Sequence, residues 1–520
     1  MKRRQFIATL GATAAAGSLA GCATSTESGA RASRPNVLFI IADQHRADCL
    51  GAYGNRQVRT PHLDALAADG VRFDNCFCPF PVCTPSRYSM FSGMYVYEHG
   101  GSNNRCTLRP DIPTLPRALR DAGYRTAAVG KMHFTPTYLD IGFERMFLAE
   151  QDGDGRWDDD YHRELMQRGL IDLNDIEDQR REFRARARTE YWETFGALPT
   201  NLPAEMHSTE WIGRKSLELI DEWGSEGNLL VSSFVKPHHP FDAIGEDADG
   251  YDAATLELLP GWTQECFAHD LALQPGYFPH KDLTEVRLRR VMAYYYATIE
   301  QIDRQVGAMV AKLKAKGIYD NTVIVYVSDH GEYMGHHHML LKGNYMYDSL
   351  ARVPLIVKYP GNAQAGEVRT GLVSLIDLAP TLLRQARCAP PASMHGQDLA
   401  SDVAGRDVVY AEAGRGAQAM VRTRTHKLLT SENPSKRLLY DLEKDPLELE
   451  DRYADPEYAE VRERLSQLAA KWPGGKSKAE AYLDPEAPTI SGPNVPPRDL
   501  SHREAIAAYY KKQFDAIVSA

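Results

Sequence analysis

The stretch Asn36-Val-Leu-Phe-Ile-Ile-Ala-Asp43 decides the fold of this 520-residue chain. An unbroken apolar run of this kind predicts a strand buried on both faces, as in a parallel sheet. Residues 322–327 (TVIVYV) repeat the pattern and end at Ser328-Asp329. Shorter apolar runs at residues 126–129, 229–235 and 353–357 predict further strands, and helical patterns stand at residues 61–69, 113–122, 211–223 and 285–316. Strands that alternate with helices predict an α/β fold with a largely parallel sheet.

Four polar side chains follow directly after predicted strands: Asp43, Lys131, His238 and Asp329. The carboxyl ends of parallel strands meet at one edge of a sheet, and ligands bind at that edge. The sequence therefore predicts one site that is built from four separated segments.

The pattern changes near residue 401, where short strands are predicted at residues 408–411, 419–423, 427–430 and 438–442. Turn signals between them favour a smaller antiparallel sheet with a closing helix. A terminal helix is predicted at residues 504–518, and the Pro-rich residues 484–499 are predicted to wrap the surface. The predicted organisation is a leader and tether (1–34), a main α/β domain (35–400) and a C-terminal subdomain (401–520).

The N-terminus, MKRRQFIATLGATAAAGSLAGC, has the features of an export signal. Arg3-Arg4 precede an apolar stretch that is too short to span a membrane, and the whole resembles a twin-arginine signal. LAGC at residues 19–22 resembles a bacterial lipobox, in which Cys22 is lipidated after cleavage. A plain secretory signal with a chance cysteine is the alternative. We expect an exported bacterial protein of the periplasm or cell surface, held at the membrane only by a lipid anchor.

The composition is that of an ordinary soluble globular protein, with 43% hydrophobic and 25% charged residues. The formal net charge of −10 excludes nonspecific binding of nucleic acid. An anionic substrate therefore requires a local basic pocket. The eight cysteines lack paired CxxC spacing, so the sequence predicts no zinc ribbon and leaves disulfides open.

Residues 135–210 form a charged insertion with a weak strand signal. Asp152, Asp154 and Asp158 are spaced like the first ligands of an EF-hand loop. The twelfth position of such a loop requires Glu, and here it is Arg163. We therefore interpret this stretch as a solvated loop.

The segment PVCTPSR, residues 81–87, resembles the Cys-x-Pro-Ser-Arg signature of type I sulfatases, which belong to the alkaline phosphatase-like superfamily. Four further blocks stand in the family's order, at residues 36–44, 130–133 (GKMH), 236–241 (KPHHPF) and 328–332 (SDHGE). Lys342 follows at the family's distance from Asp329. YDLEKDP at residues 440–446 resembles the family's C-terminal subdomain, so the resemblance covers roughly residues 35–460.

The resemblance implies an alkaline phosphatase-like three-layer sandwich in which residues 35–400 are the catalytic domain. It also implies an enzyme that hydrolyses sulfate monoesters, with Cys83 oxidised to Cα-formylglycine (3-oxoalanine) by a maturation enzyme. In such enzymes one hydroxyl of the aldehyde hydrate attacks sulfur, and the other expels sulfate as the aldehyde forms again. An unmodified Cys83 lacks that second hydroxyl.

A divalent metal is implied by the same resemblance, because it lowers the pKa of the hydrate and binds sulfate oxygens. Asp43, Asp329 and the formylglycine at position 83 are the expected ligands, joined by Gln44 and His330. Many relatives have Asp and Asn at the last two positions. Gln keeps a carbonyl oxygen without the charge, and His offers a softer nitrogen than calcium prefers. Ca²⁺ is favoured over Mg²⁺ by analogy.

The resemblance also assigns the remaining site residues. Lys131 and Lys342 are implied to hold the sulfate, and Arg87 to steady the formylglycine. His133 is the implied base that collapses the hydrate. His238 is the implied acid that protonates the leaving oxygen, a task for which the ordinary pKa of histidine is suitable.

Three other candidates carry a weaker signal. Asn104 stands where related hydrolases have a substrate-contacting Asn. His239 is an alternative to His238, although the family's spacing favours the first histidine of KPHHPF. The histidine run at residues 336–338 is a poor chelate because consecutive side chains diverge, and we expect these residues at the pocket rim.

Two rival functions remain open from the sequence. Phosphonate monoester or phosphodiester hydrolases of the same superfamily resemble this chain at several site residues but tend to lack the pair Lys131-x-His133, which favours sulfate. A non-catalytic lipoprotein that binds sulfated glycan is the second rival, and the complete set of catalytic residue types argues against it. Sulfated carbohydrate is the expected substrate by analogy with exported polymer-degrading enzymes.

Overall fold

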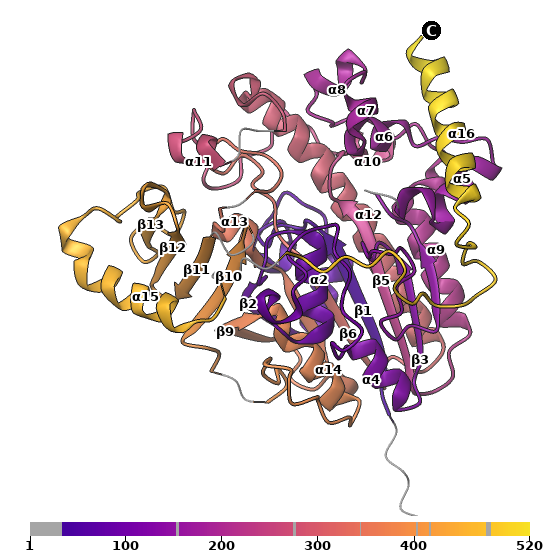
Figure 1. Cartoon of the computed structure of the whole chain (residues 1–520), viewed down its shortest axis with the longest axis horizontal. Helices are drawn as coiled ribbons and strands as arrows, with labels where there is room; N and C mark the ends of the chain where they lie inside the picture. The colour runs from indigo at the N-terminus through magenta and orange to yellow at the C-terminus, as the bar shows by residue number, and fades with distance from the viewer. Residues whose placement is uncertain are drawn as a thin grey trace, which may run out of the picture. The chain divides into compact units, whose positions relative to one another are not determined.

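The computed structural model describes residues 34–519, except residues 152–154, 274–276, 344, 402–403, 415–417 and 475–479. Within it, Arg34–Ala520 forms one compact unit (Figure 1). The leader, the tether and Cys22 lie outside the described residues, as do Asp152 and Asp154. No helix of the described part is long and apolar enough to cross a membrane.

A large mixed sheet forms the centre of this unit, in the order β4-β3-β5-β1-β6-β8-β2-β7, with β9 beside β2. Its parallel core consists of β1 (Asn36–Asp43), β3 (Arg125–Gly130), β4 (Arg145–Leu148), β5 (Asn228–Pro237) and β6 (Thr322–Ser328). β1, β3, β5 and β6 confirm predicted strands, whereas β4 lies in the insertion and was not predicted. Antiparallel pairing begins where β8 joins β6. The other strands are β2 (Val71–Phe77), β7 (Arg352–Val353), β8 (Leu355–Lys358) and β9 (Glu367–Ser374).

Alternate side chains of β1 enter two separate hydrophobic cores. Val37 and Phe39 pack in the core that also holds α2 (Cys83–Ser92), α4 (Leu115–Asp121) and α14 (Leu378–Gln385). Leu38 and Ile40 pack in the core that holds α1 (Pro61–Asp69), α9 (Ser208–Asp221) and α12 (Glu285–Ala315). Helices therefore cover both faces of the sheet, which is the predicted three-layer α/β architecture and explains the unbroken apolar run.

The predicted antiparallel sheet is present in the C-terminal part. Its strands pair in chain order and are β10 (Val408–Ala413), β11 (Gln418–Thr423), β12 (His426–Ser431) and β13 (Leu438–Asp441). α15 (Ala459–Lys471) covers this sheet through the fully buried Leu465. The terminal helix α16 (Ser501–Val518) packs elsewhere, with Tyr510 and Phe514 against the 135–210 insertion.

The insertion is mostly helical and contains α5 (Asp160–Gln167), α6 (Leu173–Gln179), α7 (Arg181–Arg184) and α8 (Thr189–Glu193). Figure 1 draws α6, α7 and α8 close together beside α10 (Gly245–Asp249). The interpretation of a solvated loop is wrong at Asp158, which is only 4% exposed. Its carboxylate accepts hydrogen bonds from Thr137, His502 and Arg503, so it serves as an anchor for α16.

Gly130 shows how closely the strands approach where the site begins. Its φ is +90°, and a Cβ there would lie 2.0 Å from the carbonyl oxygen of Ser233 on β5. A side chain would therefore push β3 away from β5 directly before Lys131.

Gly130→Ala is expected to destabilise the fold well beyond the roughly 1 kcal/mol that a positive φ costs alanine. The matched control is Gly169→Ala, since Gly169 has φ +73° and a Cβ added there would meet no described atom within 4 Å. Urea-unfolding midpoints of the two variants check this. Equal losses would show that the contact with Ser233 does not constrain the strand pair.

Candidate active site

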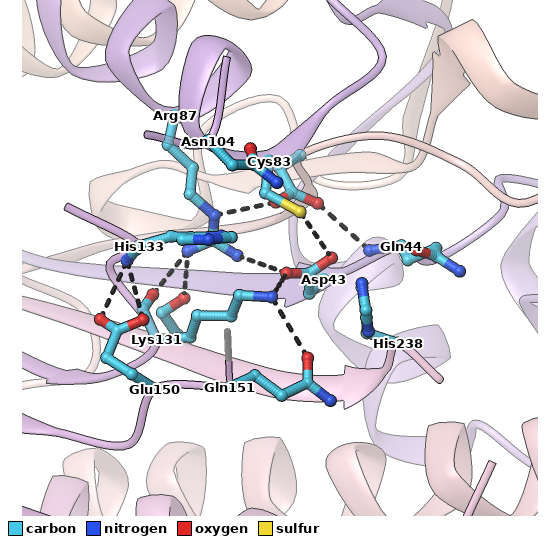
Figure 2. A network of polar contacts seen from close by, with 12 residues as sticks. Asp43, Gln44, Cys83, Arg87, Asn104, Lys131, His133, Glu150, Gln151 and His238 are labelled. Atoms are coloured by element: carbon cyan, nitrogen blue, oxygen red, sulfur yellow. Dashed lines mark hydrogen bonds and ion pairs between the residues drawn. The ribbon is translucent and has the colours of Figure 1, made fainter. Parts of the chain in front are cut away.

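The ends of the parallel strands deliver the polar residues, as predicted. Asp43 is the last residue of β1, and Asp329 directly follows β6. Lys131 follows β3, and His238 follows β5. All four side chains are buried, with exposed fractions of at most 4%. Figure 2 shows Asp43, Lys131 and His238 converging near Cys83.

Cys83 begins helix α2 and is completely buried. The first turn of α2 is tied down on three sides. Thr84 N donates to Asn104 Oδ1 over 3.1 Å, and the Thr84 hydroxyl donates to the carbonyl of His133 over 2.8 Å. The Ser86 hydroxyl donates to the carbonyl of Asp329 over 2.6 Å. These contacts fix the position-83 side chain relative to the strand ends.

Arg87 lies one helical turn after Cys83 and connects the two buried aspartates. Its Nε donates to Asp329 Oδ2 over 2.8 Å, and an Nη donates to Asp43 Oδ2 over 3.3 Å. The other Nη donates to the carbonyl of Lys131 over 2.5 Å and to Ser233 Oγ over 2.8 Å. All three nitrogen atoms of the guanidinium therefore donate hydrogen bonds that hold the strand ends together.

Lys131 supplies a second cation to Asp43, with its Nζ 2.6 Å from Oδ2. Burial favours the neutral form of Asp43 and so raises its pKa, but the cations Lys131 and Lys342 outweigh burial and hold that pKa below its usual value. Asp43 is therefore ionised, and its Oδ1 faces the Cys83 sulfur at 3.5 Å.

The Cys83 sulfur marks the place where the reacting oxygen atoms of a formylglycine would lie. Lys342 Nζ is 3.1 Å from it, and His330 Nε2 is 3.2 Å from it. Burial raises the pKa of the Cys83 thiol, but Lys342, Lys131 and His330 outweigh burial and hold that pKa well below its ordinary value. The site therefore stabilises a negative charge at this position.

The residues present fit a divalent cation. Ligand atoms of Asp43, Cys83, Asp329 and His330 all lie within 4.8 Å of one another. His330 Nδ1 donates to the carbonyl of Gly331 over 2.9 Å, which leaves the Nε2 lone pair facing the cluster. Two carboxylates and one imidazole are donors that a divalent metal accepts.

Gln44 adds an unsatisfied oxygen to this donor set. Its backbone N–H donates to Asp329 Oδ1 over 3.1 Å, and its Nε2 donates to Glu332 Oε2. Among the described residues, Gln44 Oε1 is buried and has no hydrogen-bond partner. An unpaired buried acceptor costs free energy, and a bound cation would satisfy it.

His238 and Lys342 lie together at the sulfur. Lys342 Nζ is 2.8 Å from His238 Nε2 and 3.3 Å from His330 Nε2. Burial and the Lys342 ammonium hold the pKa of His238 well below its ordinary value. Lys342 therefore contacts both the side chain at position 83 and the imidazole of His238.

His133 and Asn104 border the same place. The imidazole of His133 contributes a hydrogen bond that lowers the pKa of Cys83, while its Nδ1 is buried without a partner in the described part of the chain. Asn104 is half-buried, and its side-chain oxygen is occupied by Thr84 N. The structure thus brings together in one cluster the residues to which the resemblance assigns roles at Cys83.

Three supporting residues were missed by the sequence reasoning. Glu150 accepts the backbone N–H groups of Met132 and His133, each over 2.9 Å. Gln151 accepts from Lys131 Nζ over 3.3 Å, and Glu332 holds Gln44. Of the three, only Glu332 lies in a block that the sequence analysis quoted, SDHGE at residues 328–332. Glu150 and Gln151 lie in no such block, so no sequence motif indicated their contacts.

The histidine run at residues 336–338 is buried, and of its side chains only His336 lines a described pocket, one whose lining does not include Cys83. The three side chains are 3%, 0% and 5% exposed, and each bonds to a backbone carbonyl. His337 also lies 2.9 Å from Asp270 Oδ2. Their carbonyl partners include Leu447 and Glu448, so the run ties the C-terminal part to the main sheet.

The described cysteines are all unpaired: Cys49, Cys76, Cys78, Cys83, Cys106, Cys266 and Cys388. Burial raises the pKa of Cys76 well above the ordinary thiol value, in contrast to Cys83. Cys83 thus differs from this buried structural cysteine in its electrostatic environment.

Three cations and two carboxylates around a buried nucleophile position, at the strand ends of a three-layer α/β fold, define a hydrolase site for an anionic ester. The sequence model of the sulfatase family matches residues 35–387, and that of the N-sulphoglucosamine sulphohydrolase C-terminal region matches residues 335–472. An arylsulfatase of Clostridium perfringens is 30% identical over 478 residues, which cover 87% of this chain and 96% of that protein. The chain belongs to the sulfatase family.

Two further similarities bear on the reaction. An N-acetylglucosamine-6-O-sulfatase of Bacteroides thetaiotaomicron is 26% identical over 509 residues, covering 87% of this chain and 88% of that protein. The solved phosphonate monoester hydrolase of Agrobacterium radiobacter is 26% identical, with a TM-score of 0.69 and coverage of 84% and 96%. The chain is thus a sulfuric ester hydrolase with an alkaline phosphatase-like fold.

Asp329→Asn is expected to reduce divalent-metal content strongly, because the cation loses a charged oxygen ligand. Elemental analysis after dialysis against a defined calcium concentration measures this. Asp303→Asn is the control, since Asp303 is a buried carboxylate that accepts the backbone N–H groups of His62 and Leu63 away from the site. Equal metal content in the wild type and Asp329→Asn would contradict the ligand assignment.

Proposed function

We propose that this sulfatase cleaves sulfate monoesters of carbohydrates, with a formylglycine made from Cys83 and a bound divalent cation. The observation that carries the proposal is the surroundings of the Cys83 sulfur, which has Lys342, His330 and Asp43 within 3.5 Å. When present, formylglycine supplies a hydrated aldehyde as nucleophile, and the cation supplies Lewis acidity. The two carboxylates and Gln44 offer oxygen ligands that either Ca²⁺ or Mg²⁺ accepts, and Ca²⁺ is proposed by analogy with the family.

The sulfate group is bound by Lys131 and Lys342. Both ammonium groups lie beside the nucleophile position, and Lys131 is held in place by Asp43 and Gln151. Arg87 bridges the two aspartates and offsets part of their charge, which holds the strand ends together. Fixed charges of this kind stabilise the negative charge of the transition state without reorganisation.

His133 and His238 handle protons on the two sides of the reaction. His133 is the proposed base that accepts a proton from the position-83 side chain, and no described group competes for its Nδ1. His238 is the proposed acid for the leaving oxygen through Nε2, which now contacts Lys342. A bound sulfate would engage Lys342 and favour the protonated form of His238. Asn104 is proposed to contact the substrate.

A carbohydrate substrate is favoured by the relative from Bacteroides thetaiotaomicron, whose name states activity on N-acetylglucosamine-6-O-sulfate. The second candidate function is phosphonate monoester hydrolysis, which the fold similarity to the Agrobacterium radiobacter enzyme supports. Lys131 and His133 favour sulfate, because the phosphonate and phosphodiester hydrolases of the superfamily tend to lack this Lys-x-His pair. The full set of catalytic residue types argues against a protein that only binds glycan.

Turnover of 4-nitrophenyl sulfate and of a phenyl phosphonate ester separates the two candidates. The wild type is expected to prefer the sulfate by at least about tenfold in kcat/KM, equivalent to about 1.4 kcal/mol of transition-state binding. Cys83→Ala is expected to lose essentially all sulfatase turnover while keeping its fold, as circular dichroism checks. Wild-type turnover by folded Cys83→Ala would refute the proposed nucleophile, and a preference for the phosphonate would refute the proposed substrate class.

Maturation is expected to precede folding and export. Cys83 is completely buried, so a maturation enzyme must reach the CTPSR segment while the chain is unfolded. A twin-arginine signal carries folded proteins, so the cytoplasmic precursor is expected to contain formylglycine already. Mass spectrometry of precursor trapped by Arg3→Lys and Arg4→Lys tests this. Unmodified Cys83 in the trapped precursor, with aldehyde in exported protein, would reverse the order; the same analysis of Cys22 tests the proposed lipid anchor.

A further inference from the structure

His239, the second histidine of KPHHPF, is held by the insertion. Its Nδ1 lies 2.5 Å from Oδ2 of Asp178, a residue of helix α6. Asp178 is fully buried and also accepts the Tyr191 hydroxyl over 2.6 Å. Burial alone would raise the pKa of Asp178, but His239, the Tyr191 hydroxyl and Arg184 together outweigh burial and keep that pKa below the ordinary value. A buried, ionised aspartate therefore fixes the orientation of this imidazole.

His239 in turn touches His238 in two ways. The two rings stack at 4.1 Å between centroids with an angle of 24°. His238 Nδ1 lies 2.7 Å from the backbone oxygen of His239. Because a carbonyl only accepts, Nδ1 carries the proton, and Nε2 is left as the nitrogen that exchanges a proton with the substrate.

The same backbone oxygen receives two glutamine side chains. Gln151 Nε2 donates to it over 2.8 Å, and Gln179 Nε2 donates over 3.1 Å. Gln151 also accepts from Lys131 Nζ at 3.3 Å, as Figure 2 shows. The carbonyl that orients His238 is thus held in place by donors from the insertion and is connected to a residue of the sulfate site.

We infer that Asp178 and His239 form a positioning pair that holds His238 with Nδ1–H donating to the His239 carbonyl, so that Nε2 takes up a proton and passes it to the leaving oxygen. This inference rests on the proposed role of His238. Neither residue of the pair is assigned contact with the substrate. The insertion, through α6, therefore acts on the chemistry indirectly, by positioning His238.

The physical reason is the loss of freedom that the pair imposes on His238. Without the Asp178 carboxylate, the His239 ring can rotate, so the surface on which His238 stacks becomes variable. Gln179 also loses its contact with Asp178 Oδ2 and holds the carbonyl that accepts from His238 Nδ1 less firmly. His238 then keeps its Nδ1–H···O contact for less of the time, so its Nε2 is less often oriented to take up a proton and pass it to the leaving oxygen. The effect grows with the basicity of the leaving oxygen, because a general acid matters most for a poor leaving group.

The test compares an alkyl sulfate with 4-nitrophenyl sulfate. Asp178→Ala is expected to lower kcat on the alkyl sulfate by about 10- to 100-fold, a part of what a complete general acid contributes. On 4-nitrophenyl sulfate, whose leaving group needs little protonation, kcat is expected to fall less than about threefold. KM for both substrates is expected to stay near that of the wild type, because Lys131 and Lys342 still bind the sulfate.

Three further variants make the result specific. Glu177→Ala is the matched control, since Glu177 is a buried carboxylate on the same helix that pairs with Arg188. It is expected to lose stability without distinguishing the two substrates. Asp178→Asn keeps an oxygen acceptor for His239 and is expected to restore part of the alkyl sulfate rate. In a His238→Ala background, Asp178→Ala is expected to add no further selective loss, because the pair acts through His238.

The outcomes separate this inference from the proposed function. If His238→Ala is selective for the alkyl sulfate but Asp178→Ala is not, the positioning pair is overturned while the role of His238 stands. Equal losses on both substrates in Asp178→Ala, matched by Glu177→Ala, would show a purely structural role. If His238→Ala affects both substrates equally, His238 is not the acid, and the positioning inference is overturned with it.

Discussion

Arg87 lies between two buried carboxylates, and the rest of the site depends on this contact. Its Nε is 2.8 Å from Asp329, and an Nη is 3.3 Å from Asp43, with all three side chains 0% exposed. Taking such charges out of water costs several kcal/mol per ion, so the contact persists only when each group is fully satisfied. The carbonyl of Lys131 and the hydroxyl of Ser233 accept the remaining hydrogen bonds that the guanidinium donates. Helix α2 and the ends of four strands are thereby fixed around Cys83.

The contact also explains how an acidic protein binds an anion. The chain carries a formal charge of −10, yet Arg87, Lys131 and Lys342 outnumber the two aspartates around the Cys83 sulfur. Low exposure strengthens these interactions and reduces their screening by salt. The low pKa of the Cys83 thiol reports the same field, which favours an anionic nucleophile and a bound sulfate.

The sequence predicted the elements that have a regular apolar pattern and the polar residues that directly follow a strand. β1 and β6 are buried on both faces, so their apolar runs are unbroken, and the strand ends place Asp43 and Asp329. The antiparallel edge at β7 and β8 carried no such signal, because orientation depends on connections rather than composition. Asp178 was missed because its partner, His239, lies far along the chain and no short motif joins them. The histidines at 336–338 were placed at a rim, although backbone carbonyls hold them in the interior.

Turnover is proposed to depend on formylglycine at position 83 within this charge cluster. The most direct measurement compares preparations matured to different extents by a co-expressed maturation enzyme. Peptide mass spectrometry gives the fraction of Cys83 present as aldehyde or hydrate, and 4-nitrophenyl sulfate turnover gives the active fraction. Turnover is predicted to be proportional to the aldehyde fraction, with none when every Cys83 is a thiol. Full turnover by a preparation that contains only the thiol would contradict this dependence.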